Sequence, residues 1–345
     1  MSSCGDSSLE DVEVRALTPV EDPDFAVAHA VLAEYEVPPA EVRAIRLSNN
    51  SVYSVSPTAS AAERLVLRVH RPNYRTTTQV EAELALLERI AVDGRVRAPR
   101  PVRTTDGRLV AELRDGSGIR SCDLLTWVEG RVLRPTMGLG QSGVTELGRT
   151  LGCLHNALAA SDQMAAGCLP RWHASVLFTE ESPFRPGPLS KVFDSSQLLL
   201  IRDVASRTEE VFRELDKVSG SFGIIHFDFI LLNCRMRRRA GEWDVGVIDF
   251  DDCGWGYFLY DLAAIVGNLA DFPGHPRMRD TFLAGYREVR DLPDSAEANL
   301  PLLMAARHVV SALCFAGRER AKPDSVAEHV AYRVDQARAC LALDS

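Results

Sequence analysis

Hydrophobic and polar residues follow different periods in the two halves of the chain. In the first 127 residues, short runs that alternate or are rich in β-branched residues indicate strands. These runs cover 42–47, 52–55, 65–70, 108–113 and 119–127. Helical spacing of apolar residues appears at 24–37 and again at 79–91. The pattern therefore predicts an antiparallel sheet with one helix inserted after its third strand.

The second half of the chain is dominated by helical spacing. The predicted elements are, in order, helices at 141–160 and 194–218, an irregular apolar segment at 222–237, a turn at 238–241, a strand at 243–250, and helices from 259 onward. The last helical part is interrupted at its prolines, which end helices. A sheet followed by helices is an α+β arrangement of two lobes.

The pattern changes near residues 128–130, and this divides the chain. We predict an acidic, mobile arm over 1–24, a first lobe over 25–128 and a second lobe over 129–345. The 345 residues are 46% hydrophobic and 25% charged, which is typical of a globular protein.

Composition also narrows the classes of function. The net charge of −9 disfavours nucleic-acid binding, which needs a basic face. No stretch approaches the roughly 18 apolar residues of a membrane span, and the first residues lack the pattern of a secretory signal. We therefore expect a soluble cytoplasmic protein with no nucleic-acid or membrane partner. The sequence leaves the oligomeric state open.

One segment has a pattern suited to phosphoryl transfer. His226, Asp228 and Asn233 lie in one apolar loop, and Asp249 follows a short hydrophobic strand. Phosphoryl transfer needs a positioned acceptor oxygen, a base and metal ions across the phosphates. Magnesium prefers oxygen ligands, usually one or two carboxylates together with phosphates and water. The His-x-Asp-x-x-x-x-Asn spacing with a later Asp matches the catalytic loop of protein kinases.

The same region resembles a family. Val-Ile-Asp-Phe-Asp-Asp at 247–252 and Tyr-Asp-Leu-Ala at 260–263 look like the aminoglycoside phosphotransferase superfamily, with Leu-His at 154–155 as a further match. That superfamily includes antibiotic kinases, choline and homoserine kinases, and a stress-response kinase of protein hydroxyls. The resemblance covers roughly residues 43 to 270. It implies a protein-kinase-like fold with a nucleotide-binding first lobe and a catalytic, substrate-binding second lobe.

The resemblance implies roles for the acidic residues of the second lobe. It makes Asp228 the catalytic base, and Asn233 and Asp249 the magnesium ligands. Asp251 is expected to assist with the metal or with the acceptor. Asp-Phe-Asp at 249–251 replaces the Asp-Phe-Gly of protein kinases, and this favours the small-molecule branch of the family.

Four further residues of the motifs are expected to be structural. His226 braces the catalytic loop, and His155 is a satisfied core histidine. The resemblance makes Asp261 the helix aspartate that ties the catalytic loop from behind. Trp255 is expected to pack rather than to bind a ligand.

The nucleotide phosphates are expected to meet the first lobe. Asn50 and Ser51 lie in the first hairpin, where small polar residues let backbone N–H groups approach phosphates. Arg68 occupies the third-strand position where kinases have lysine, and the first 190 residues contain no lysine. Glu83 resembles its partner on the helix, with Glu81 as the alternative.

Adenine is expected at the junction of the lobes, against the backbone of Thr126, Trp127 and Val128.

Two departures from the family pattern concern the acceptor. Phe227 replaces the usual glycine after the loop histidine, and 230–232 is Ile-Leu-Leu in place of small residues. These bulky residues indicate a less polar or unusually shaped acceptor pocket, and they argue against an ordinary aminoglycoside.

The sequence therefore predicts an ATP- and magnesium-dependent kinase of a hydroxyl group on a small molecule, such as an antibiotic, an amino alcohol or a related metabolite. One alternative is a protein serine/threonine kinase of the stress-response type. The helical tail at 300–343 favours a closed pocket over the open groove that a protein acceptor needs. The other alternative is a nucleotide-binding pseudokinase, and it is disfavoured because the base and both metal ligands are present.

Overall fold

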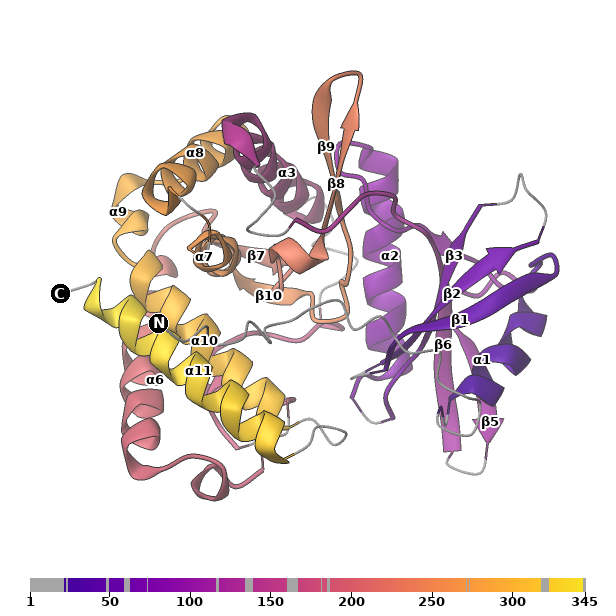
Figure 1. Ribbon diagram of the computed structural model, residues 1–345, viewed down its shortest axis with the longest axis horizontal. Helices are drawn as coiled ribbons and strands as arrows, with labels where there is room; N and C mark the ends of the chain where they lie inside the picture. The colour runs from indigo at the N-terminus through magenta and orange to yellow at the C-terminus, as the bar shows by residue number, and fades with distance from the viewer. Residues whose placement is uncertain are drawn as a thin grey trace, which may run out of the picture. The chain divides into compact units, whose positions relative to one another are not determined.

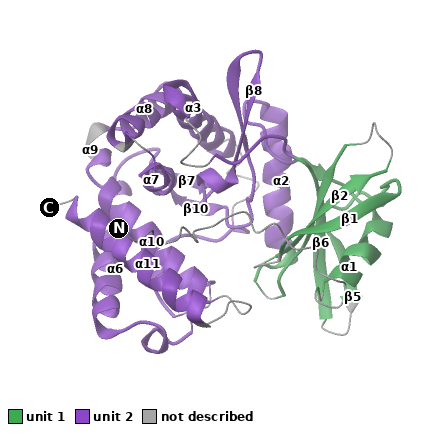
Figure 2. Cartoon of the chain, in the orientation of Figure 1, with its two compact units in different colours: residues 1–77, 100–127 green, residues 78–99, 128–345 purple. Residues whose placement is uncertain are grey.

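The computed structural model divides the chain into two compact units (Figure 2). Unit 1 comprises residues 1–77 and 100–127, and unit 2 comprises residues 78–99 and 128–345. The structure describes residues 22, 24–47, 50–58, 63–72, 74–115, 118–133, 139–159, 167–180, 182–184, 187–270, 272, 274–317 and 323–343. The α+β class and the kinase-like arrangement of a sheet followed by helices are confirmed. Residues 78–99, which lie within the predicted first lobe, group with the second unit.

Unit 1 is built on an antiparallel sheet (Figure 1). Its strands are β1 (Ala40–Leu47), β2 (Ser51–Pro57), β3 (Leu65–Val69), β4 (Pro101–Val102), β5 (Ala111–Asp115) and β6 (Gly118–Thr126). The order is β1-β2-β3-β6-β4, and β5 also pairs with β6. Every strand predicted in this part of the sequence is present, whereas β4 was not predicted.

Helix α1 (Phe25–Val31) continues into a short 3-10 turn, η1 (Leu32–Glu34), and supplies apolar residues to the core of this unit. The buried core residues are Val27, Ala28, Val31, Tyr35, Tyr53, Val55, Leu67, Val69, Ala111, Cys122 and Leu124. Alternate residues of β2 and β3 enter this core because successive side chains of a strand point to opposite faces.

The predicted mobile arm lies mostly outside the described residues, but its last part is docked. Asp22 and Asp24 are both buried. Asp22 accepts a hydrogen bond of 2.9 Å from the Tyr53 hydroxyl. Asp24 accepts one of 2.5 Å from the Ser51 hydroxyl and pairs with Arg120 at 2.8 Å. These two residues are therefore part of unit 1 and not of a mobile arm.

Unit 2 contains most of the helices. They are α2 (Thr77–Asp93), α3 (Gly140–Ala159), α5 (Ala174–Leu177), α6 (Ser195–Leu215), α7 (Phe258–Leu269), α8 (His275–Arg287), α9 (Asp294–Glu297), α10 (Leu300–Ala316) and α11 (Pro323–Ala342), with 3-10 turns η2 (Leu189–Lys191) and η3 (Leu231–Asn233). The long helices were predicted with small differences at their ends. No helix of the described part of the chain is both long and apolar enough to cross a membrane.

Two small sheets complete unit 2 and carry the predicted catalytic loop. Strands β7 (Phe222–Ile225) and β10 (Gly254–Tyr257) pair with each other, as do β8 (Cys234–Arg239) and β9 (Glu242–Val247). The predicted turn at 238–241 is confirmed, because Ala240 and Gly241 form the tip of the β8–β9 hairpin, both with positive φ. The segment at 222–237 was predicted as irregular, and it instead contains β7 and most of β8.

Helix α7 is the centre of unit 2. Ten of its twelve residues are buried, so it is covered on all sides, which is typical of a core helix. Close to it, α3 packs against α8 through glycines. A Cβ atom built on Gly148 of α3 would lie 2.1 Å from the carbonyl oxygen of Phe282, and one on Gly285 of α8 would lie 2.3 Å from that of Thr145. These two helices approach more closely than side chains at those positions would allow.

Candidate active site

The catalytic loop connects β7 to β8 and is held by a single carboxylate of α7. Asp261 is fully buried and accepts the backbone N–H groups of His226 and Phe227, each at 2.8 Å. The two hydrogen bonds fix the entry to the loop immediately before Asp228. The predicted role of Asp261 as the residue that ties the loop from behind is confirmed.

Both histidines of the motifs are structural, as predicted. His155 donates from Nε2 to Asp261 at 3.2 Å, and its Nδ1 accepts from the Tyr286 hydroxyl at 2.9 Å. Burial lowers the pKa of His155, which keeps the ring neutral in this arrangement. His226 donates from Nε2 to the carbonyl oxygen of Ile248 at 3.0 Å and so braces the loop against the segment that leads to Asp249.

The carboxylate of Asp228 lies between an amide and a guanidinium group. Its Oδ2 accepts from Nδ2 of Asn233 at 3.0 Å, and the same Nδ2 donates to the Asp228 carbonyl oxygen at 2.9 Å. Its Oδ1 accepts from Nη2 of Arg307, which comes from α10. The Asp228 side chain remains 30% exposed. Sequence reasoning did not identify Arg307, because it is 79 residues away in the chain and belongs to no motif.

Asn233 and the strand end at Asp249 are joined through the backbone. The N–H of Ile248 donates to the carbonyl oxygen of Asn233 at 3.0 Å, which places Asp249 next to the loop. Asp249 has a φ of +70°, a left-handed conformation that is uncommon outside glycine. Strain of this kind persists where the surroundings over-determine the backbone, and it concentrates at functional sites.

Negative charge is crowded at this strand end. Burial raises the pKa of Asp251 well above its usual range, and the charges of Asp249, Asp252 and Glu83 raise it further. Glu83 lies on α2 and is buried, whereas Glu81 is exposed. Of the two candidate glutamates, Glu83 is the buried one, and it lies close enough to Asp251 to raise the pKa of that carboxyl group.

The donor set fits a hard divalent cation. Asn233 uses its amide nitrogen for Asp228, so its side-chain oxygen is the atom that remains for a metal. Asp249 and Asp251 add carboxylate oxygens, and a cation would relieve their mutual repulsion. The described residues contain no group of three or more His, Cys, Asp and Glu side chains that could hold a metal. Magnesium does not require such a group, since it takes one or two carboxylates and keeps phosphates and water.

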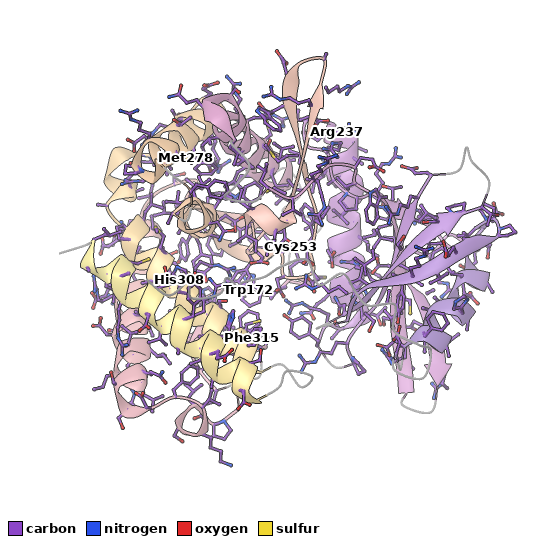
Figure 3. The ribbon with its side chains drawn as sticks, in the orientation of Figure 1. Trp172, Arg237, Cys253, Met278, His308 and Phe315 are labelled. Carbon is purple, nitrogen blue, oxygen red and sulfur yellow. The ribbon has the colours of Figure 1, made fainter. Side chains whose placement is uncertain are left out.

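Phe227 departs from the expected glycine and keeps the glycine conformation. Its φ is +70°, and its side chain is 2% exposed. The ring stacks on Trp172 at 4.2 Å and lies 5.4 Å from Tyr260 and 5.9 Å from Phe184, between ring centroids. Trp172 is labelled in Figure 3. These aromatic contacts offset the cost of the left-handed backbone, which is about 1–3 kcal/mol.

The remaining predicted packing residue also behaves as expected. Trp255 lies in β10 and is 9% exposed. Its ring is 6.1 Å from that of Phe222, and the guanidinium of Arg171 lies over it at 5.2 Å.

Arg68 is buried in unit 1 and has a carboxylate partner in the same sheet. Its Nε donates to both oxygens of Asp123, at 3.0 and 3.1 Å, across the β3–β6 register. His70 donates to the same carboxylate at 2.5 Å. Burial opposes ionisation of Asp123, but Arg68 and His70 hold its pKa below the usual range. Asp123 was not predicted, because nothing in the local sequence distinguishes it from other strand residues.

Asn50 and Ser51 are both held by side-chain hydrogen bonds inside unit 1. Asn50 Oδ1 accepts the backbone N–H of Arg71 at 3.1 Å. The Ser51 hydroxyl donates to Asp24 at 2.5 Å, so its role in this structure is to anchor the start of α1. Ser48 and Asn49 of the same predicted loop lie outside the described residues.

Two of the three predicted adenine contacts already use their backbone donors. The N–H of Thr126 donates to the carbonyl oxygen of Arg100, and that of Trp127 to the carbonyl oxygen of Arg64, each at 2.9 Å. The Arg64 guanidinium also lies 3.7 Å from the Trp127 ring centroid. Val128 is buried in unit 2. Thr126 and Trp127 could therefore meet a base through their carbonyl oxygens but not through these N–H groups.

The chain matches known proteins over most of its length. A model of the phosphotransferase enzyme family matches residues 41–298. An uncharacterized protein of Deinococcus radiodurans is 31% identical over 280 residues, which are 80% of this chain and 78% of that protein. Among solved structures, the microcompartment-associated aminopropanol kinase has a TM-score of 0.72 at 25% identity and covers 93% of this chain and 98% of that one. Amicoumacin kinase hAmiN, solved with AMP-PNP, Ca²⁺ and Ami, has a TM-score of 0.72 at 19% identity and covers 92% of this chain and 94% of that one.

Proposed function

Because the chain belongs to the phosphotransferase enzyme family, it is a kinase of a hydroxyl group on a small molecule, and we propose that Asp228 is its catalytic base. The donor is ATP with magnesium. The observation that carries the assignment is the joining of Asp228, Asn233 and the Asp249 strand end by hydrogen bonds of 2.9–3.0 Å. These three residues supply the base and the oxygen ligands that phosphoryl transfer requires.

The geometry supports a direct transfer from ATP to the acceptor. The acceptor hydroxyl donates to the partly exposed Asp228 carboxylate, and its oxygen attacks the γ-phosphorus. One P–O bond forms, the bond from the γ-phosphorus to the β–γ bridging oxygen breaks, and ADP leaves. The hydroxyl proton passes to Asp228. Asn233 keeps the carboxylate in one orientation during this step. Asn233 and Asp249, with Asp251 beside them, would hold a magnesium ion, and the ion would supply positive charge to the phosphates.

In the first unit we propose that Arg68 contacts the nucleotide phosphates. Its planar guanidinium has five N–H donors, and Asp123 uses the Nε edge. Glu83, the predicted partner of Arg68, belongs to the other compact unit and is buried near Asp251. We propose that Asp123 orients Arg68 and that Glu83 supports the metal end of the site.

The acceptor is a small hydroxylated molecule. The matched kinases include aminopropanol kinase and amicoumacin kinase, which are named for small molecules, and this supports the small-molecule assignment over a protein acceptor. The presence of the base and both proposed metal ligands speaks against a pseudokinase.

The test is ADP release from ATP and magnesium in three acceptor panels: antibiotics, amino alcohols, and sugars with related polyols. Asp228→Ala should lower turnover by about 10²–10⁴-fold, since a general base contributes that much. The increase in melting temperature that AMP-PNP causes should be the same in this variant as in the wild type. Asp335→Ala is the matched control, because that aspartate on α11 is 72% exposed. Turnover of Asp228→Ala within threefold of the wild type would contradict the assignment.

A further inference from the structure

Arg307 places a permanent positive charge beside the proposed base. It lies in the middle of α10, and its side chain is only 15% exposed. Its Nη2 donates to Oδ1 of Asp228, while Asn233 occupies Oδ2. A hydroxyl group that donates to Asp228 therefore binds a carboxylate that already carries the Arg307 guanidinium on one of its oxygens.

Aromatic rings hold Arg307 in this position. The guanidinium carbon lies 5.2 Å from the ring centroid of Phe227 and 5.8 Å from that of Tyr260. Phe227 is fixed in turn by its stack on Trp172. Cation–π contact with buried rings stabilises a guanidinium in one place. Phe227 of the catalytic loop and Arg307 of α10 are therefore in direct contact, with the guanidinium over the ring.

Further basic groups lie where α10 packs against α11. His308 follows Arg307 and is labelled in Figure 3. Its Nδ1 lies 3.3 Å from Nη1 of Arg333 on α11, and Nε of Arg333 lies 3.4 Å from Nε2 of His329. Burial lowers the pKa of His308, and the charges of Arg333 and Arg307 lower it further. Arg333 thus adds positive charge beside His308, whereas Arg307 is the guanidinium that contacts the Asp228 carboxylate.

We propose that Arg307 is a specificity-determining residue of the acceptor site and that it selects an acceptor whose reactive hydroxyl lies next to a carboxylate or another oxygen. This inference rests on the proposed function, since it takes Asp228 as the base. An oxygen group next to the hydroxyl can accept from Arg307 while the hydroxyl donates to Asp228. An ammonium group at the same place would lie beside the Arg307 guanidinium, which stays positively charged at all working pH values. Repulsion between the two positive charges would disfavour binding of such an acceptor.

The experiment compares three acceptors that share one diol and differ in the neighbouring group: glycerate, glycerol and 3-amino-1,2-propanediol. The three acceptors represent anionic, neutral and cationic compounds, and larger hydroxy acids, sugars and amino alcohols are added to these three classes in turn. ADP release gives kcat/KM for each acceptor in the wild type, Arg307→Met and Arg307→Glu. Arg338→Met is the matched control, since Arg338 lies on α11 with a side chain that is 47% exposed.

The wild type should prefer the best hydroxy acid or polyol over the best amino alcohol. Arg307→Met should lower kcat/KM for hydroxy acids at least tenfold and change that for amino alcohols much less, with the KM for ATP unaltered. Arg307→Glu should shift the ratio further toward amino alcohols, and Arg338→Met should leave it unchanged. A best acceptor with an ammonium group next to its reactive hydroxyl would overturn the proposal, and so would an equal loss in all three classes. If the wild type bound AMP-PNP with magnesium but consumed ATP in no panel, the proposed function would fail, and this inference with it.

Discussion

The Nε atom of Arg68 lies 3.0 and 3.1 Å from the two carboxylate oxygens of Asp123, and neither side chain is appreciably exposed. Removing one partner of a buried ion pair leaves an uncompensated charge and typically costs about 3–5 kcal/mol. We therefore expect Asp123→Ala to lower the free energy of unfolding by that amount, as measured by urea denaturation. Asp106→Ala, in an exposed pair with Arg108, should have a much smaller effect.

A double substitution separates the structural role of Arg68 from its proposed contact with phosphates. Replacing a buried pair by apolar residues of similar size is often neutral for stability. Arg68→Met combined with Asp123→Leu should therefore recover most of the unfolding free energy lost in Asp123→Ala, yet kcat/KM for ATP should fall tenfold or more. Full recovery of kcat/KM as well would show that Arg68 serves the sheet alone.

The proposed metal site predicts how substitutions change the magnesium concentration that activity requires. Asp249→Asn should raise the magnesium concentration needed for half-maximal activity most, and Asn233→Ala should raise it less, because Asp249 carries the charge and Asn233 offers a neutral oxygen. The measurement is a magnesium titration at fixed ATP. The matched control is Asp252→Asn, which removes a neighbouring charge that is not a proposed ligand. Wild-type titration curves for both of the first two variants would place the metal elsewhere.

The buried His308 predicts how stability depends on pH. Burial, with Arg333 and Arg307 adding to it, lowers the pKa of His308 to about 3, whereas an unfolded histidine has a pKa of about 6.5. Below pH 6.5 the unfolded chain therefore binds a proton that the folded chain does not, and stability falls as the pH drops toward 3. Between pH 7.5 and pH 5.0, the free energy of unfolding of His308→Leu should fall by up to about 2 kcal/mol less than that of the wild type. This difference corresponds to about 1.4 kcal/mol for each pH unit below the pKa of the unfolded histidine.

Urea denaturation at the two pH values measures this difference. His173→Leu is the control, because His173 is exposed and should leave the pH dependence unchanged. An identical loss in the wild type and in His308→Leu would mean that the folded protein binds the proton on His308 as readily as the unfolded chain does.

The contact between α3 and α8 predicts that two helical glycines differ in their tolerance of alanine. Gly148→Ala should destabilise the protein by about 2–3 kcal/mol, because its Cβ would lie 2.1 Å from the Phe282 carbonyl oxygen and the helices would have to move apart. Gly267→Ala in α7 should be neutral or stabilising by up to about 1 kcal/mol, since its Cβ would lie 3.8 Å from Met304. The melting temperatures of the two variants check this, and equal values would contradict the packing.

The parts of the site that the sequence predicted are those that a local pattern encodes. Asp228, Asn233 and Asp249 have fixed spacing, and the turn of the backbone between them is short. Asp123 and Arg307 could not be found in this way, because each meets its partner across 55 or 79 residues, and a lone aspartate in a strand or arginine in a helix has no distinguishing neighbours. Strand β8 was missed for a different reason. Its consecutive arginines at 237–239 resemble a solvated charge run, although Cys234 and Met236 are buried.

The segment 78–99 lies between two strands of unit 1 in sequence but belongs to unit 2 in space. Arg97 fixes its end there, since its carbonyl oxygen accepts the N–H of Val247 at 2.8 Å and its side chain pairs with Asp244 at 3.2 Å. Neither unit is therefore a continuous stretch of polypeptide. A fragment beginning at residue 129 would lack α2, the helix that groups with the same unit. Expressing the two units as separate polypeptides would require residue 77 to be joined to residue 100 in one piece and residue 99 to residue 128 in the other.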